Sequence, residues 1–537
     1  MAANDNPVDA RDELLAEAAS LAAAMAPQDT AVGDLLRYFR AYYGHVPAED
    51  LAAAGPDRLA QIALEQARLA AHRPQGRSLV RVLPAPEAPT FDPGRAAVDI
   101  MTDDMPFLID SITMELARHN LDSYHVIHPQ LVVRRDVAGD LHGVSGALNG
   151  GRSGQDELVE SWTHIEVDLR ACSAPVDVLE IDLHRVLDNV RVAVEDYPRM
   201  QAKATWLADR LAAEGPRAPT ETVALLRWLA DNHFTFLGYR EYDLLEGPDG
   251  MALQAVTGTG LGILRHDRRG SSAFAALPPE VRARAKDPQR LILTKANSRS
   301  TVHRPSYLDY VSIKRVDALG EVDGEYRFLG LYTHAAYHES ITRIPVLRRK
   351  LANVLEAAGM TPDSHDGQDI MEILEGYPRE ELFQITPAEL TPIALGVLAL
   401  RERRQTRLFL RRDRYGRYMS CLVYLPRDRY TTVVRLRAQE IMRASFGGIA
   451  VEYSATIGDS AFARLHVVVR AERGRQLAEV DPAELEARVA AAVRPGMRTW
   501  PPRPGPGWVR PSRRCCWRRA PARSRRPTSR MCPPPTR

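Results

Sequence analysis

The residue types best suited to bind a charged ligand gather in one basic stretch, TKANSRSTVHRPSYLDY, at residues 294–310. Its polar side chains include those of Lys295, Asn297, Arg299, His303 and Arg304. Planar guanidinium groups match carboxylates and phosphates, so this set between two expected strands could hold an anion. An exposed loop or a salt-bridged surface between domains explains the same residues. The stretch therefore predicts either an anion or effector site or an inter-domain contact, and the sequence leaves both open.

A pair of adjacent carboxylates, Asp103 and Asp104, is the second feature with chemical character. Adjacent side chains diverge, whereas the two carboxylates of a catalytic pair usually come from elements that face each other. Pro106 and Phe107 follow, and an apolar repeat at helical spacing begins at Leu108. Carboxylates just ahead of a helix favour its N-terminal amides. We interpret the pair as helix capping, with ligand contact through the same turn as the alternative and catalysis as the least favoured.

Three other groupings of reactive residue types are better explained by structural roles. The Ser-His-Asp run at 364–366 is consecutive and cannot form the relay geometry of a triad, so it predicts a turn before a helix. No nearby Cys or carboxylate completes a metal shell around His119, His125 and His128, and we expect structural histidines. The glycines at 258–262 lack the spacing and frame of a dinucleotide site and predict a flexible turn. We assign no catalytic, cofactor-binding or metal-binding residue in this chain.

The composition is that of a soluble globular protein, with 45% hydrophobic and 26% charged residues among 537. Ordinary domain sizes predict three or four domains in a chain of this length. Only Cys172 and Cys421 lie outside the last 37 residues, which favours a reducing cytoplasm over a disulfide framework. The N-terminus lacks the pattern of a signal peptide, and no apolar run reaches the length of a membrane span. We therefore expect a cytoplasmic protein without a membrane partner.

The last 37 residues, 501–537, differ abruptly from the rest. They contain eleven Arg and ten Pro but no acidic residue. Without them the chain carries 60 basic against 69 acidic residues, and this acidic body argues against a specific nucleic-acid partner. A segment of this composition cannot supply a core, which predicts a disordered tail. An out-of-frame reading of GC-rich DNA is the sharper explanation of the same composition.

The first half of the body alternates helices and strands as an α+β protein does. Residues 11–43 predict amphipathic helices, and a Pro-rich joint follows at 84–93. A strand, a turn and a helix ending near Asn120 come next, and strands follow at 125–135 and 160–170. This order predicts a small α+β sandwich.

The second half repeats that character. A long helix over 179–197 meets Pro198, which we expect to break or kink it. Several strands and then helices follow. A hairpin over 407–425, a helix closed by Gly447 and two more strands predict a second sandwich.

Several long and unusual segments resemble the N-terminal part of the large bacterial NAD-specific glutamate dehydrogenases. They are TDDMPFLIDS, ESWTHIEVD, LLRWLADNHFTFLGYREYDL, TKANSRSTVHRPSYLDYVSIKR, RFLGLYTHAAY, IPVLRRKL, SHDGQD and YPREELFQ. The matches run in order from about residue 35 to residue 498. The resemblance implies a regulatory half made of ACT-like domains and a PAS-type domain, joined in the family to a Rossmann-containing catalytic domain. It also implies that the family enzymes oxidise L-glutamate to 2-oxoglutarate and ammonia with NAD as homo-oligomers.

The resemblance divides the chain into seven segments. They are an N-terminal helical segment (1–83), an ACT-like domain (84–176), a helical connector (177–215), a PAS-like α+β domain (216–340), a second helical connector (341–395), a second ACT-like domain (396–497) and a disordered Arg/Pro-rich tail (498–537). Phe107 stands where a ligand-binding ACT turn carries Gly, and a bulky ring there obstructs the close approach of an amino acid.

The resemblance implies a regulatory segment that stops, or loses its reading frame, before the catalytic domain. We expect this chain alone to be inactive and to bind no NAD, which would belong to the full-length enzyme. Its expected partners are other subunits of the family or the missing catalytic domain, and an amino-acid effector. The alternative is a stand-alone module that senses an amino acid or another small anion, with a hydrolase as a distant third.

Overall fold

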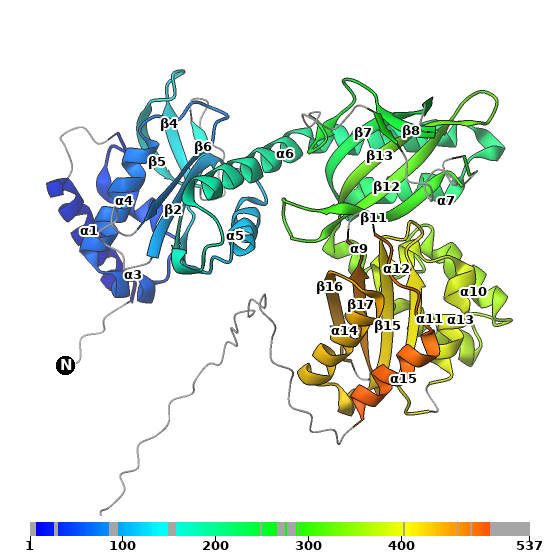
Figure 1. The fold of residues 1–537 in the computed structure, drawn as a ribbon. Coiled ribbons are helices and arrows are strands. Elements are labelled where there is room, and N and C mark those ends of the chain that lie inside the picture. The colour runs from blue at the N-terminus through cyan, green and yellow to red at the C-terminus, as the bar shows by residue number, and fades with distance from the viewer. Residues whose placement is uncertain are drawn as a thin grey trace, which may run out of the picture.

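Three antiparallel β-sheets, each covered by helices, make up the computed structural model of the chain (Figure 1). The mixed α+β class expected from the sequence is confirmed. No helix in the described ranges has the length and apolar character to cross a bilayer. The structure describes residues 7–25, 31–84, 95–148, 157–247, 250–265, 274–276, 286–287, 289–400, 403–458, 460–472 and 475–494, so the expected tail lies outside them.

Four N-terminal helices cover one face of the first sheet. They are α1 (Pro7–Met25), α2 (Leu35–Tyr42), α3 (Ala48–Ala54) and α4 (Pro56–Ala70). Asp34 begins α2, where its carboxylate accepts a hydrogen bond from the amide of Arg37 at 2.8 Å. Buried aromatic rings of α2 pack with Trp162 of the sheet, so these helices and the sheet share one core.

The first sheet has the order β1-β2-β6-β4-β5, with β3 also paired to β6. Its strands are β1 (Leu79–Pro84), β2 (Arg95–Asp103), β3 (Ser123–Ile127), β4 (Gln130–Arg135), β5 (Leu141–Ala147) and β6 (Leu158–Asp168). The single strand predicted over 125–135 is wrong. The chain leaves the sheet at His128 and Pro129, because proline has no N–H to continue a ladder, and β3 and β4 then pair with different stretches of β6.

Helices α5 (Leu108–Arg118) and α6 (Val176–Ala212) cover the opposite face of this sheet. The helix end predicted near Asn120 is confirmed: α5 ends at Arg118, and Asn120 follows with a φ of 60°, in the left-handed region. Helix α6 runs through Pro198 without a break and links the first sheet to the second (Figure 1). One helix therefore contributes to the cores of two sheets.

The second sheet has the order β10-β8-β7-β13-β12-β11, with β9 on β7. Its strands are β7 (Phe234–Gly247), β8 (Gly250–Ala255), β9 (Leu261–Gly262), β10 (Phe274–Ala276), β11 (Leu291–Arg299), β12 (Tyr307–Val316) and β13 (Val322–Tyr332). The C-terminal half of α6 packs with α7 (Thr220–Trp228) in the core of this sheet. The glycine-rich stretch at 258–262 forms a turn and the short strand β9.

A group of helices separates the second sheet from the third in sequence. They are α9 (His334–His338), α10 (Leu347–Ala357), α11 (His365–Glu375), α12 (Arg379–Gln384) and α13 (Pro387–Leu398). The run at 364–366, for which the sequence predicts a turn before a helix, instead begins α11: the Ser364 hydroxyl accepts from the amide of Gly367 at 3.1 Å.

The third sheet has the order β14-β15-β17-β16. Its elements are β14 (Arg407–Arg412), β15 (Tyr418–Pro426), α14 (Thr432–Phe446), β16 (Ala450–Thr456), β17 (Phe462–Arg470) and α15 (Pro482–Val493). The predicted hairpin and the helix closed by Gly447, whose φ is 65°, are both confirmed. Helices α14 and α15 cover one face of this sheet. The other face lies against α12 and the second sheet.

Candidate ligand-binding site

The basic stretch lies where the second sheet meets the third. Lys295 on β11 is buried, and its ammonium lies 2.8 Å from Asp309 and 3.0 Å from Glu380 of α12. Burial alone would lower the pKa of Lys295, but the two carboxylates raise it. Burial also raises the pKa of Asp309 to about 6, despite the neighbouring ammonium. This buried group of charges links β11 and β12 to α12.

The other polar side chains of the stretch also meet partners from distant segments. Arg299 pairs with Glu452 of β16 at 2.7 Å, and His303 contacts Asp110 of α5 at 3.0 Å. Arg304 donates to the carbonyl of Tyr332 at 2.7 Å, and Asn297 accepts from Arg417 at 3.5 Å. These contacts agree with the inter-domain interpretation of the stretch. An anion could bind only to those residues of the stretch that line a cavity.

A cavity of about 400 Å³ adjoins two of the five predicted residues, Lys295 and Arg299. Its other walls include Glu380 of α12, Glu452 of β16, and His466 and Arg470 of β17. The walls thus come from the second sheet, from the helical group and from the third sheet. Asn297, His303 and Arg304 do not line it.

Arg470 is the side chain with the least complete set of partners in this cavity. It is 8% exposed, and its guanidinium lies over the ring of Tyr307, 3.3 Å from the centroid. The nearest carboxylate, that of Glu452, is 3.9 Å from its Nε, and no acceptor among the described residues bonds that atom. Burial lowers the pKa of Arg470, against the pull of Glu452. The Nε–H of this buried guanidinium has no bonded acceptor among the described residues, as is also true of Nε of Arg304 and Arg379.

The side chains on the inner wall of the cavity, unlike Arg470, have hydrogen-bond partners. Glu381 accepts from Arg411 of β14 at 2.8 Å and 3.0 Å, and both side chains are buried. The imidazole of His466 lies 2.9 Å from the hydroxyl of Ser420, and burial lowers its pKa. The inner wall therefore carries charged side chains that are already paired.

The acidic turn before α5 is built differently from the capping interpretation, which is wrong. The residue at the helix start is Phe107, with no side-chain cap. Asp103 instead pairs with the buried guanidinium of Arg73 at 2.7 Å and with Arg191 at 2.5 Å, and Asp104 accepts from Gln130 at 2.9 Å. The full positive charges of nearby arginines attract the Asp103 carboxylate more strongly than the partial positive charge of the helix N-terminus does.

Phe107 takes a φ of 71°, the left-handed conformation that favours glycine. Its ring centroid lies 4.9 Å from that of His303. Together with Asp104 it lines a cavity of about 950 Å³ beside α2. Ligand contact through this turn stays a prediction, and the ring of Phe107 occupies part of the approach.

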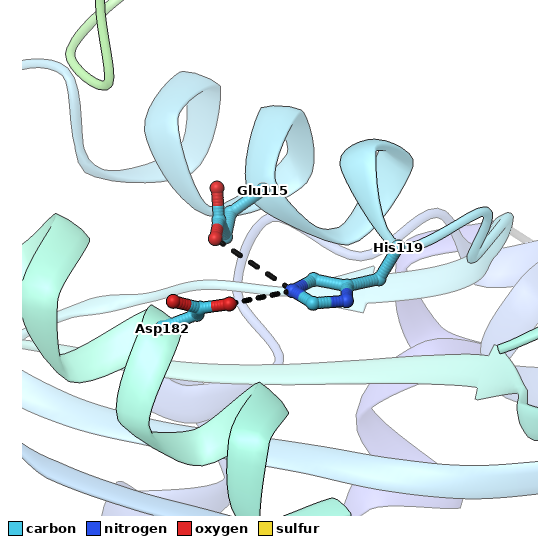
Figure 2. A group of neighbouring side chains, drawn as sticks. All are labelled: Glu115, His119 and Asp182. Atoms are coloured by element: carbon cyan, nitrogen blue, oxygen red, sulfur yellow. Dashed lines mark hydrogen bonds and ion pairs between the residues drawn. The ribbon is translucent and has the colours of Figure 1, made fainter. Parts of the chain in front are cut away.

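His119, one of the three clustered histidines, meets two carboxylates, contrary to the expectation that none lies nearby: one is four positions earlier in the sequence and one comes from a distant helix. His119 lies 3.0 Å from Asp182 of α6 and 3.7 Å from Glu115 of its own helix (Figure 2). Arg118 and Arg185 pair with the same two carboxylates. Two guanidinium groups already supply the positive charge that a metal ion would bring, so we interpret the group as an ion-pair network that ties α5 to α6.

Arg470, Glu380, Glu452 and His466 were missed by the reasoning from sequence. A signal was present in strand β17, where residues 464, 466 and 470 are polar and the intervening positions are apolar. Alternation of this kind shows that the face opposite the apolar core is polar. It cannot show which element covers that face.

Three family models match separate parts of the chain. They are described as the ACT1 domain of glutamate dehydrogenase over residues 38–183, its helical motif 1 over 344–403 and its ACT2 domain over 407–500. The ACT1 match begins before residue 84, so this family model takes in α3 and α4 together with the first sheet. The chain thus matches two ACT-domain models and one helical-motif model of glutamate dehydrogenase.

Curated relatives give the same answer. The chain is 35% identical to an NAD-specific glutamate dehydrogenase of Halomonas elongata over 84% of its length. It is 36% identical over 74% to that of Pseudomonas aeruginosa, and 32% identical over 81% to that of Mycobacterium tuberculosis. The chain belongs to the family of NAD-specific glutamate dehydrogenases. It spans only 28%, 25% and 26% of the lengths of these three relatives.

Proposed function

We propose that this chain is the N-terminal regulatory part of an NAD-specific glutamate dehydrogenase and carries no dehydrogenase activity alone. The observation that supports the proposal most is the pairing of the strands. Every named strand pair in the described residues is antiparallel, whereas a dinucleotide-binding domain is built on a mostly parallel sheet. The oxidation of L-glutamate with NAD would then belong to a catalytic domain with which this part assembles.

The proposal extends to the domain between the two ACT regions. We propose that the seven-stranded sheet is the PAS-like module of the family, because it is an antiparallel sheet flanked by helices between the two ACT matches. We also propose a cytoplasmic homo-oligomer, supported by the free thiols of Cys172 and Cys421 and by the family.

Purified chain incubated with L-glutamate and NAD tests the proposal. We expect no NADH absorbance above the level of a no-glutamate control, and no rise in Tm on adding NAD, because ligands that bind the native state raise its stability. The Pseudomonas aeruginosa enzyme, assayed in parallel, is the positive control. Glutamate-dependent NADH formation that copurifies with the chain would overturn the proposal.

A second candidate function is sensing of a small molecule. The incompletely paired guanidinium of Arg470, facing a cavity between separate sheets, favours it. Regulatory and sensing roles are compatible, since a ligand held between domains biases their arrangement.

A further inference from the structure

We propose that Lys350 is a site of covalent acylation, at which a small acyl phosphate that enters a cavity between β11, α12 and β14 transfers its acyl group to the side-chain amine. The proposal goes beyond the regulatory assignment above and does not depend on it. Three observations carry it: the hydrogen bonding of the amine, its access to the cavity, and a guanidinium group in the same cavity that pairs with no carboxylate of the described residues.

The amine of Lys350 has carbonyl oxygens, and no carboxylate of the described residues, as its hydrogen-bond partners. Its Nζ donates to the carbonyls of Leu382 and Phe383 at 2.8 Å and 2.7 Å. A carboxylate at this distance would hold the nitrogen in its protonated form. Lys295 shows the contrast, because its ammonium lies 2.8 Å from Asp309 and its pKa is raised. Lys350 lacks an ion pair of this kind.

The charged groups around Lys350 leave its amine largely neutral. Burial, and then the charge of Arg411 on β14, lower the pKa of Lys350 to about 7, although Glu389 of α13 and Glu381 of α12 act in the opposite direction. At about pH 7.4 such an amine is mostly neutral, whereas a lysine of pKa 10.5 is neutral in roughly one molecule in a thousand. A neutral amine has a free electron pair and can act as a nucleophile.

A cavity of about 850 Å³ gives small molecules access to this amine. Lys350 is one of its lining residues and is not fully buried. The volume falls within the usual range for small-molecule pockets, about 300–1,000 Å³. Its lining also includes apolar side chains that would contact a short acyl chain, those of Leu291, Leu293, Phe383 and Ile385.

Arg412 lines the same cavity and is the side chain best suited to hold a phosphate. It donates one long hydrogen bond, of 3.5 Å, to the carbonyl of Leu477, and no carboxylate of the described residues pairs with it. The other two arginines of the lining are paired, Arg411 with Glu381 and Arg414 with Asp287. Guanidinium groups bind phosphate oxygens through paired N–H donors, so Arg412 can bind the phosphate end of the reagent.

The carboxylates that line the cavity are already bound to other groups. Asp287 pairs with Arg414, Asp413 with Arg417, and Glu389 accepts from the amide of Thr386 at the start of α13. With the amine of Lys350 neutral, Arg412 is the cation of the described lining that has no carboxylate partner. A phosphate would supply that partner.

The reaction needs no further reagent. The nitrogen of Lys350 attacks the carbonyl carbon of the acyl phosphate, and a C–N bond forms. The C–O bond to the phosphate breaks, its electron pair leaves with the phosphate, and the proton lost by the nitrogen goes to that phosphate. The products are an amide on Lys350 and hydrogen phosphate. Negative charge on the leaving group is stabilised by the guanidinium of Arg412.

Acylation should alter the contact between Lys350 and α12. An amide nitrogen keeps one N–H, so at most one of the two bonds to the carbonyls of this helix can remain. On the same helix Glu380 pairs with Lys295 of the second sheet. The next residue, Glu381, pairs with Arg411 of the third sheet. Loss of a hydrogen bond to the helix that links the two sheets should lower the stability of the chain.

The test treats the full chain with acetyl phosphate and follows acetylation of each lysine by mass spectrometry. The chain has five lysines, at positions 203, 286, 295, 314 and 350. At about pH 7.4 we expect Lys350 to be acetylated at least about tenfold faster than Lys203 or Lys295. The side chain of Lys203 is 39% exposed, so exposure alone would favour Lys203 over Lys350. Above about pH 8 the rate at Lys350 should level off, whereas the rate at Lys295 should keep rising.

Two variants test the phosphate contact. Arg412→Gln should slow acetylation of Lys350 by acetyl phosphate about tenfold, because a charge-assisted hydrogen bond is lost. Acetylation by acetic anhydride, which carries no phosphate, should be unchanged. Arg407→Gln is the matched control: this arginine lies on the same strand, pairs with Glu486 at 3.1 Å and does not line the cavity, so neither rate should change.

The outcomes decide the matter in either direction. Acetylation of Lys350 no faster than that of Lys203, or an Arg412→Gln effect equal to that of Arg407→Gln or equal for the two reagents, would overturn the proposal. The Tm of acetylated wild type should fall and that of Lys350→Met treated in the same way should not. An unchanged Tm would overturn the link to α12. If Lys350→Met does not fold, the rates at single lysines of the wild-type chain still decide.

Discussion

Burial strongly lowers the pKa of one side chain, that of Lys350 on α10. Its ammonium donates to the carbonyls of Leu382 and Phe383 at 2.8 Å and 2.7 Å, and carboxylates are more remote. Burial, and secondly the charge of Arg411, lower the pKa of Lys350 to about 7. Near neutral pH this side chain therefore loses its proton in the folded protein and keeps it in the unfolded chain.

The stability of the protein should depend on pH through this residue. The ordinary pKa of 10.5 applies to the unfolded chain, so between about pH 7 and 10.5 the unfolded state binds more protons. The free energy of unfolding should accordingly rise with pH over this window, by at most about 1.4 kcal/mol per unit from this group. Urea unfolding of Lys350→Met should show a flatter profile than wild type. Parallel profiles for the two proteins would show that Lys350 stays charged in the fold.

The turn between β2 and α5 is the element in which backbone strain is clearest. A non-glycine residue in the left-handed region is disfavoured by roughly 1–2 kcal/mol, and Phe107 adopts that region with its ring half-buried. Packing of the ring against the core of the first sheet and His303 offsets the strain.

Two substitutions at Phe107 separate packing from strain. Both Phe107→Ala and Phe107→Gly lose the ring, but only glycine also relieves the backbone, so Phe107→Gly should be the more stable by about 1 kcal/mol. At Ile109, two residues further on in the helix, the order should reverse, because alanine is the better helix former by about 0.5–1 kcal/mol. Urea unfolding of the four variants measures this. An alanine variant more stable than the glycine variant at position 107 would contradict the strained conformation.

At the scale of the whole molecule, two connections hold the sheets together. Helix α6 contributes apolar residues to the cores of the first and second sheets (Figure 1). The second and third sheets share the apolar core of the helices between them. They also meet through polar contacts, in which Arg417 donates to the carbonyl of Lys295 and to the hydroxyl of Thr294, both at 2.6 Å. Arg414 adds an ion pair with Asp287 at 3.0 Å.

Removing both arginines should loosen the third sheet from the second. Each lost hydrogen bond to a charged group is worth about 1.5–3 kcal/mol, so Arg414→Ala/Arg417→Ala should lower stability by several kcal/mol. We expect the urea transition to broaden or split, and trypsin to cut between the second and third sheets more readily. Arg475→Ala, at an exposed pair with Glu472, is the control and should leave both measurements unchanged. A double variant that behaves like this control would show that the polar contacts do not couple the sheets.

Local chemistry was readable from the sequence alone. The hairpin at 407–425, the helix end near Asn120 and the helix end at Gly447 follow from turn residues and short periodicity. The resemblance to the family could also be seen, because long motifs stand in order along the chain. These features depend on residues a few positions apart, whose geometry the backbone itself limits.

Only the tertiary structure decided which charges meet. Asp103 pairs with Arg73, 30 positions earlier in the sequence, and does not cap the helix. Arg299 pairs with Glu452, 153 positions later in the sequence. Arg470 lies beside a cavity, over the ring of Tyr307 and 3.9 Å from the carboxylate of Glu452. On an open surface these charged side chains would be solvated by water. They meet protein partners only because the sheets dock and bring those partners together. That docking depends on the apolar faces of elements far apart in the chain, and short-range sequence patterns carry no record of it.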